Sequence, residues 1–192
     1  MTRRKVGALP LLDWADAHAK AIIRRRRLIR RAVIIGAGCA LLIDSAMAPR
    51  RPLLIWNVSA SAPIGLYLVR APTGIMPGDM VAAKLAEPYA ALADQRRYLP
   101  RAVPLIKRVV ATSHDVVCAD DGGISVNGRW LAARPLVDAK GRAMPSWQGC
   151  YSLYDGQVIL LMGGHLDSFD GRYFGVTDPQ NIIGKVTLLW AK

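Results

Sequence analysis

Hydrophobic and polar residues follow two different patterns along the chain. Before residue 49 the apolar positions suit a helix, and 32–43 is an uninterrupted apolar run. From Pro49 onward, short apolar runs are separated by Gly, Pro, Asn and Asp, which is typical of antiparallel β proteins. We therefore expect a mainly β domain over residues 49–192, behind an N-terminal helix.

The β domain is expected to contain one short inserted helix among its strands. Glu87–Leu99 is rich in helix-forming residues and predicts this helix. Asn127-Gly128 lies between two apolar runs and favours a type I′ hairpin. The strands are predicted at Leu53–Val58, Gly65–Val69, Asp79–Lys84, Leu105–Val110, Ile124–Val126, Trp130–Ala132, Gln157–Met162 and Lys185–Trp190.

The charge of the chain at first suggests a protein that binds nucleic acid. Its 192 residues carry 26 Lys and Arg against 14 Asp and Glu, which gives a net charge of +12. Residues 1–31, however, hold ten basic and two acidic groups, so this segment alone carries +8. A basic block directly before an apolar run is typical of the cytoplasmic flank of a membrane segment. We therefore expect no nucleic-acid partner.

The apolar run at 32–48 is predicted to be a transmembrane helix or a signal segment. Its 17 residues are at the short end of the ~17–25 that span a bilayer. Cleavage after Ala48, in an A-x-A sequence, is the alternative. Both interpretations make residues 1–31 a cytoplasmic leader at the bacterial inner membrane and place 49–192 in the periplasm. A buried helix of a soluble protein would leave the basic flank unexplained.

The three cysteines are expected to differ in state because of this topology. Cys39 lies in the apolar run and should be a free thiol. Cys118 and Cys150 both lie on the exported side, where a disulfide can form and persist. Two separately buried thiols are the alternative.

Familiar enzyme motifs are absent from the sequence. The three histidines lack metal-binding spacing, and there is neither a Walker loop nor a dinucleotide-binding turn. We therefore expect no cofactor and no metal. Asp167 and Asp170 are only a weak indication of a calcium site, because an oxygen-rich loop is missing. A Ser-His-Asp triad that uses His114 or His165 stays open.

Two segments carry candidate chemistry of another kind. Strand alternation in Leu105–Val109 puts Lys107 on a face with apolar neighbours. Burial would lower the pKa of this lysine, which is the condition for a general base, but on the pattern alone an edge-strand lysine that prevents aggregation is favoured. Ser59–Gly65 is a turn of small residues, which either exposes a nucleophilic hydroxyl or is an ordinary polar turn.

Four blocks in this chain resemble, in order, those of type I signal peptidases. Asn57–Tyr67 resembles the nucleophile motif, and its short S-x-P-x-G-x-Y form is similar to the branch that contains a conjugative-transfer peptidase. Met76–Val81 resembles the next block, Ile106–Ala111 the block with the catalytic lysine, and Asp167–Gly175 the last block. Ile183–Val186 resembles the closing strand.

The chain departs from the pattern of that family at three places. Thr112–Asp115 follows the lysine block where the family has Pro-Gly-Asp, and Gly163-Gly164-His165 replaces Gly-Asp-Asn. Gly171 stands where serine is common. None of these changes affects the serine or the lysine of the expected dyad, but they alter the loops around it.

The resemblance implies a serine endopeptidase of signal-peptidase fold that works through an acyl-enzyme. Ser61 would be the nucleophile and Lys107 its general base. The Ser59 hydroxyl would join the Ser61 N–H in stabilising the oxyanion, although Ser59 as a mere turn former is equally favoured. Ser168 would orient the lysine, and Asp170 with Arg172 would support the site, unless they form an ordinary surface ion pair.

The same resemblance implies a membrane-tethered precursor as substrate, cleaved after small residues. In the conjugative branch this precursor is a propilin of a conjugation or secretion apparatus. Its acyl-enzyme is released either by water, which gives a linear product, or by the pilin's own amino terminus, which gives a ring. A non-catalytic β module of an envelope secretion complex, in which Ser61 and Lys107 are incidental, is the alternative function.

Overall fold

The protein is described by a computed structural model of residues 10–47 and 51–192. Within the N-terminal helix, the side chains of residue 18 and of residues 20–43 are described. The chain divides into two units, one up to Arg50 and one from Arg51 to Lys192, and each is described by itself.

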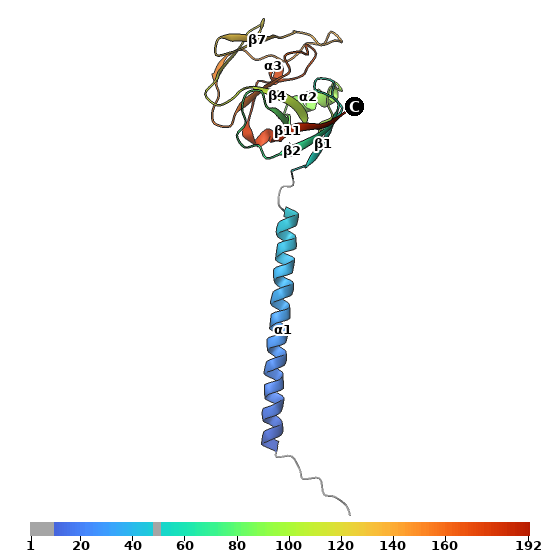
Figure 1. Ribbon diagram of the computed structural model, residues 1–192, viewed down its shortest axis with the longest axis vertical. Helices are drawn as coiled ribbons and strands as arrows, with labels where there is room; N and C mark the ends of the chain where they lie inside the picture. Colours follow the sequence, from blue (N-terminus) through green and yellow to red (C-terminus); the bar gives the residue numbers. More distant parts are fainter. Residues whose placement is uncertain (1–9, 48–50) are drawn as a thin grey trace, which may run out of the picture. The chain divides into compact units, whose positions relative to one another are not determined.

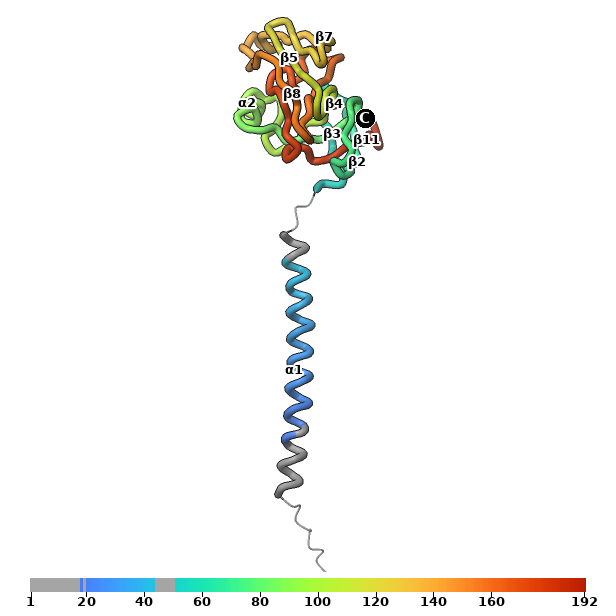
Figure 2. Tube along the Cα trace, turned by 90° about the vertical axis from the view of Figure 1, so that its left-hand side faces the viewer, coloured from blue at the N-terminus to red at the C-terminus, as the bar shows by residue number. Residues whose placement is uncertain are grey.

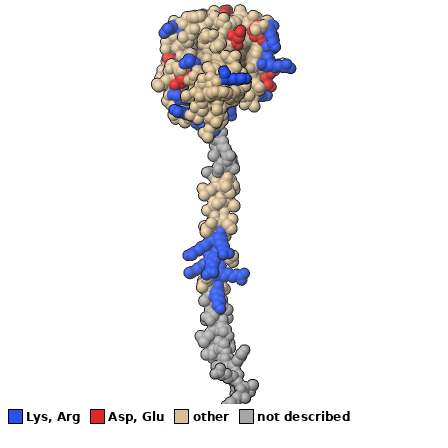
Figure 3. Space-filling model, turned by 45° about the vertical axis from the view of Figure 1, so that its right-hand side comes forward, with Lys and Arg blue, Asp and Glu red and all other residues tan. Residues whose placement is uncertain are grey.

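The first unit is a single helix, α1 (Pro10–Met47), which joins the predicted leader and the apolar run. In Figure 3 the lysines and arginines of this helix gather along a short length of it, which includes the exposed side chains at 24–27. The predicted transmembrane span is not supported, because no helix among the described residues is long and apolar enough to cross a membrane. The possible cleavage after Ala48 falls outside the described residues.

The second unit contains two antiparallel sheets (Figures 1 and 2). Both views place β7 at one end of this unit and β2 with β11 at the other. The larger sheet has the order β1-β2-β11-β3-β4-β9-β10, and the smaller one β7-β6-β5-β8. The strands of the larger sheet are β1 (Leu54–Asn57), β2 (Gly65–Arg70), β3 (Met80–Ala83), β4 (Leu105–Ala111), β9 (Val158–Leu161), β10 (Val176–Thr177) and β11 (Ile182–Ala191). Those of the smaller sheet are β5 (Val116–Ala119), β6 (Gly123–Val126), β7 (Arg129–Ala133) and β8 (Gly149–Ser152).

The prediction of a mainly β, antiparallel fold is confirmed, and each of the eight predicted strands is present. The predicted hairpin joins β6 to β7, with positive φ at Asn127 (51°) and Gly128 (77°) as a type I′ turn requires. Sequence analysis missed β5, β8 and β10. The inserted helix, α2 (Tyr89–Gln95), is shorter than predicted, since Arg97 has the left-handed φ of 60° and ends it.

The apolar core lies around the middle strands of the larger sheet. Strand β4 pairs with β3 on one side and β9 on the other, so it is an inner strand. The interpretation of Lys107 as an edge-strand lysine is therefore wrong. Val81 and Val109 are fully buried beside it, in the core formed by β3, β4 and β9.

A disulfide staples the smaller sheet. Cys118 of β5 and Cys150 of β8 are paired across the two strands and bonded, 32 residues apart in sequence. The alternative of two buried thiols is thus wrong. Cys39 is free and exposed, as expected.

Candidate active site

Ser61 lies in the turn that joins β1 to β2. The turn begins at Asn57, which pairs with Gly65 across the two strands. The Oγ atoms of Ser59 and Ser61 are 3.0 Å apart. The backbone N–H of Ser61 has no acceptor among the residues that the structure describes. This N–H is therefore available to a ligand.

The inside of the turn is filled by the amide of Asn57. Its Nδ2 donates to the carbonyl oxygens of Ser59 (2.9 Å), Ala62 (3.1 Å) and Pro63 (3.0 Å). Its Oδ1 accepts the N–H of Ser59 at 3.0 Å. The hydroxyl of buried Tyr67 donates to the same Pro63 carbonyl at 2.8 Å. The backbone is thus fixed on both sides of Ser61.

Gly65 lets the end of the turn approach strand β11. A Cβ atom at this position would lie 2.0 Å from the carbonyl oxygen of Trp190, which is far inside van der Waals contact. Only glycine therefore allows β2 to pair with the last residues of β11 at this point.

The side chain of Lys107, on the inner strand β4, extends to Ser61. Its Nζ lies 2.7 Å from Ser61 Oγ and 2.7 Å from Ser168 Oγ. Only 4% of this residue is exposed. Burial lowers the pKa of Lys107 to about 8, against the opposing charge of Asp170 and with a smaller contribution from Arg172. A neutral amine is consequently accessible near physiological pH.

Ser168 is held in place by a buried ion pair. Arg172 and Asp170 are both fully buried, and Arg172 Nη2 lies 2.9 Å from Asp170 Oδ2. The same guanidinium donates to the carbonyl oxygens of His165 (2.6 Å) and Ser168 (3.4 Å). The alternative of an ordinary surface ion pair is wrong. The pair instead fixes the segment that presents the Ser168 hydroxyl to Lys107.

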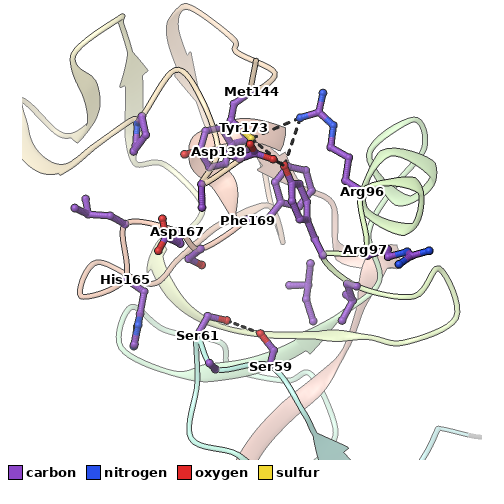
Figure 4. A pocket seen from close by; sticks show the side chains of 18 of the residues that line it. Ser59, Ser61, Arg96, Arg97, Asp138, Met144, His165, Asp167, Phe169 and Tyr173 are labelled. Atoms are coloured by element: carbon purple, nitrogen blue, oxygen red, sulfur yellow. Dashed lines mark hydrogen bonds between the residues drawn. The ribbon is translucent and has the colours of Figure 1, made fainter. Parts of the chain in front are cut away.

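A cavity of about 430 Å³ opens above these groups. Figure 4 shows Ser59 and Ser61 on one side of it, and Arg96, Asp138 and Met144 on the other. Arg96 donates to the carbonyl oxygen of Ala143 at 2.9 Å, which ties the end of α2 to the loop at 135–144. The cavity is therefore bounded by two walls, and sequence analysis did not anticipate the second.

The alternative sites do not assemble around Ser61. No histidine bonds to Ser61 Oγ, whose described side-chain partners are Ser59 and Lys107. The His114 side chain is exposed and lies 3.7 Å from Asp155, whereas His165 lines the cavity. Both oxygens of Asp170 bond to Arg172. No cluster of three or more potential metal ligands occurs in the described part of the chain.

One departure from the family pattern has a direct structural reason. Gly171 begins the short helix α3 (Gly171–Phe174), which packs against β9. A Cβ atom at this position would lie 2.8 Å from the Leu160 carbonyl oxygen, so a serine would require the helix to shift. Trp147 Nε1 donates to the Gly171 carbonyl at 3.0 Å.

Comparison with known proteins agrees with the motifs. The family described as signal peptidase, peptidase S26, matches residues 25–191. The chain belongs to this family. Two plasmid transfer proteins TraF of Escherichia coli are each 31% identical to it, over 171 and 170 residues. These alignments cover 83% and 82% of this chain and 94% and 92% of the relatives. The recognition made from the sequence is confirmed.

A solved structure was also similar. Signal peptidase I of Enterococcus faecalis V583 is 18% identical, with a TM-score of 0.36, and the match covers 61% of this chain and 100% of that chain. Membership of the S26 family supports a peptidase role for this protein, and with it the hydrolase and serine-peptidase assignment.

Sequence reasoning missed two groups of the site. Asn57 was noticed only as the first letter of the nucleophile motif, and Tyr67 only as its last. No sequence signal reveals their tasks, because both side chains act through bonds to main-chain carbonyl groups of the turn. The second wall of the cavity has no sequence signal, because it comes from two loops.

Proposed function

We propose that this protein is a serine endopeptidase in which Ser61 attacks the scissile carbonyl and Lys107 is the general base. The observation that carries the proposal is the 2.7 Å contact between Ser61 Oγ and Lys107 Nζ. In the neutral amine, one N–H donates to Ser168 Oγ while the lone pair accepts the Ser61 proton. This is the chemistry that a buried lysine with a pKa of about 8 can perform.

The reaction then proceeds through an acyl-enzyme. Attack by Ser61 Oγ on the carbonyl carbon gives a tetrahedral oxyanion, for which the Ser61 N–H and the Ser59 hydroxyl are the donors. The proton on Lys107 passes to the leaving amine as the peptide bond breaks. Water then attacks the ester carbon, Lys107 takes its proton, and the freed carboxylic acid leaves while Ser61 regains its hydrogen.

The substrate in this proposal is an exported, membrane-tethered precursor such as a propilin of a conjugation apparatus. It is supported by the similarity to two proteins named for plasmid transfer. A periplasmic location of residues 51–192 is supported by the disulfide between Cys118 and Cys150, because such bonds persist in oxidising compartments.

Cleavage of a precursor with small residues before its scissile bond tests this function. We expect Ser61→Ala and Lys107→Arg each to lower kcat by ~10³-fold or more, because one lacks the nucleophile and the other cannot lose its proton. Lys185→Arg is the matched control, since Lys185 forms a partly exposed ion pair with Asp79 (2.7 Å) and should keep full activity. Folded Lys107→Arg protein with substantial activity would contradict the proposal.

A further inference from the structure

The side-chain amide of Asn57 is buried beside the site and makes four hydrogen bonds to backbone atoms. Neither the motifs nor the proposed mechanism gives this amide a role. It is 6% exposed, and it bonds to backbone on both sides of the Ser61 peptide. Burial of a side-chain amide costs free energy unless the amide is hydrogen-bonded, and an apolar residue would fill the same space without that cost. The four backbone contacts of Asn57 all lie within the turn that carries Ser61.

We propose that Asn57 is a positioning residue that sets the attack geometry of Ser61; this inference rests on the proposed function. The two Nδ2 hydrogens are shared among three carbonyl oxygens, so these carbonyls turn inward toward the amide. Oδ1 fixes Ser59, whose Oγ touches Ser61 Oγ. The nucleophile and its neighbouring hydroxyl are therefore held by one side chain that touches neither substrate nor reacting atoms.

The geometry implies an effect on the chemical step and not on substrate binding. Asn57 lies inside the turn and is not among the residues that line the cavity. A misplacement of a reacting atom by about 1 Å lowers a rate by roughly 10²-fold. We expect Asn57→Ala to lower kcat by about that factor, with KM changed by less than about 2-fold.

Asn57→Asp separates the donor from the acceptor of the amide. Its size and Oδ1 are retained, but an oxygen replaces the nitrogen that faces the carbonyl groups, so we expect kcat as low as in Asn57→Ala. Tyr67→Phe removes one bond to the Pro63 carbonyl and is expected to lower kcat by a smaller factor, again at unchanged KM. The matched control is Asn127→Ala, in the turn between β6 and β7 of the smaller sheet. It removes the bond from the Val116 N–H to Asn127 Oδ1 (2.8 Å) and the bond from Asn127 Nδ2 to Asp115 Oδ1 (2.7 Å).

The experiment measures kcat and KM of the full chain and its variants on one precursor, well below each melting temperature. Asn127→Ala should lose stability and keep kcat. A folded Asn57→Ala with kcat within about 3-fold of the wild type would overturn the inference, as would an equal loss in Asn127→Ala. If Asn57→Ala and Asn57→Asp do not fold, an unchanged kcat in Tyr67→Phe overturns it. Wild-type activity that survives Ser61→Ala would instead refute the proposed function.

Discussion

Replacing Lys107 by methionine should make the unfolding free energy vary less with pH between the folded pKa of about 8 and the unfolded value of 10.5. The pKa of this lysine falls from 10.5 in the unfolded chain to about 8 in the folded one, chiefly because of burial. Below pH 8 the folded state therefore carries a buried ammonium ion, which is less well solvated in the protein than in water. The stabilising contribution is complete above pH 10.5 and is lost as the pH falls through 8.

The size of the effect follows from the two pKa values. Each pH unit between them corresponds to about 1.4 kcal/mol, so the full change is on the order of 3 kcal/mol. Lys107→Met has a similar length and no charge, and it leaves all other titrating groups in place. The difference in unfolding free energy, wild type minus Lys107→Met, should rise by roughly this amount from pH 7 to pH 10.5.

Urea unfolding at half-unit pH intervals measures this difference. Both proteins should carry Cys39→Ser, so that the free thiol does not attack the disulfide in alkaline solution. Parallel pH profiles for the two proteins would refute the argument, because they would mean that Lys107 has an ordinary pKa in the folded state. A difference that falls with rising pH would reverse its sign and refute it as well.

Three further predictions concern the framework of the site. Asp170→Asn should lower the unfolding free energy by about 3–5 kcal/mol in urea titrations, because Arg172 is then buried without its counter-ion; a loss under about 1 kcal/mol would contradict the burial of the pair. Reduction of the Cys118–Cys150 bond should cost about 3–4 kcal/mol, and alkylation of denatured protein should rise from one thiol to three on reduction; no rise would contradict the bond. Gly65→Ala should lower the unfolding free energy by about 1–3 kcal/mol or more, because its Cβ meets backbone at 2.0 Å; an unchanged midpoint would contradict that close approach.

The sequence predicts strands best where apolar residues alternate or run together. Strand β9 is such a run, fully buried over its four residues, and it was predicted. Strand β8 has four exposed residues and is held by pairing with β5 and by the disulfide, so it has no apolar pattern to recognise. Helix α3 has only four residues and depends on the Asp170 cap, which accepts the N–H of Arg172.

The site shows the same division between side-chain patterns and backbone contacts. Strand alternation sets Lys107 among apolar neighbours but favoured an edge-strand lysine, because the pattern does not show that β4 is paired on both sides. The tasks of Asn57 and of the loop at 135–144 could not be predicted, since both depend on bonds to main-chain carbonyls that any residue supplies. The apolar run at 32–43 predicted a membrane span, but no helix among the described residues is long and apolar enough to cross a membrane.

Acylation by a penem inhibitor tests the central claim most directly, since it asks which atom is the nucleophile and which group activates it. The intact protein is incubated with the penem, digested, and mapped by mass spectrometry at a series of pH values. The account predicts one adduct, on Ser61, at a rate that rises with pH to a plateau with a midpoint near the Lys107 pKa of about 8. An adduct on another residue, or acylation of Ser61 at an undiminished rate in Lys107→Arg, would contradict it.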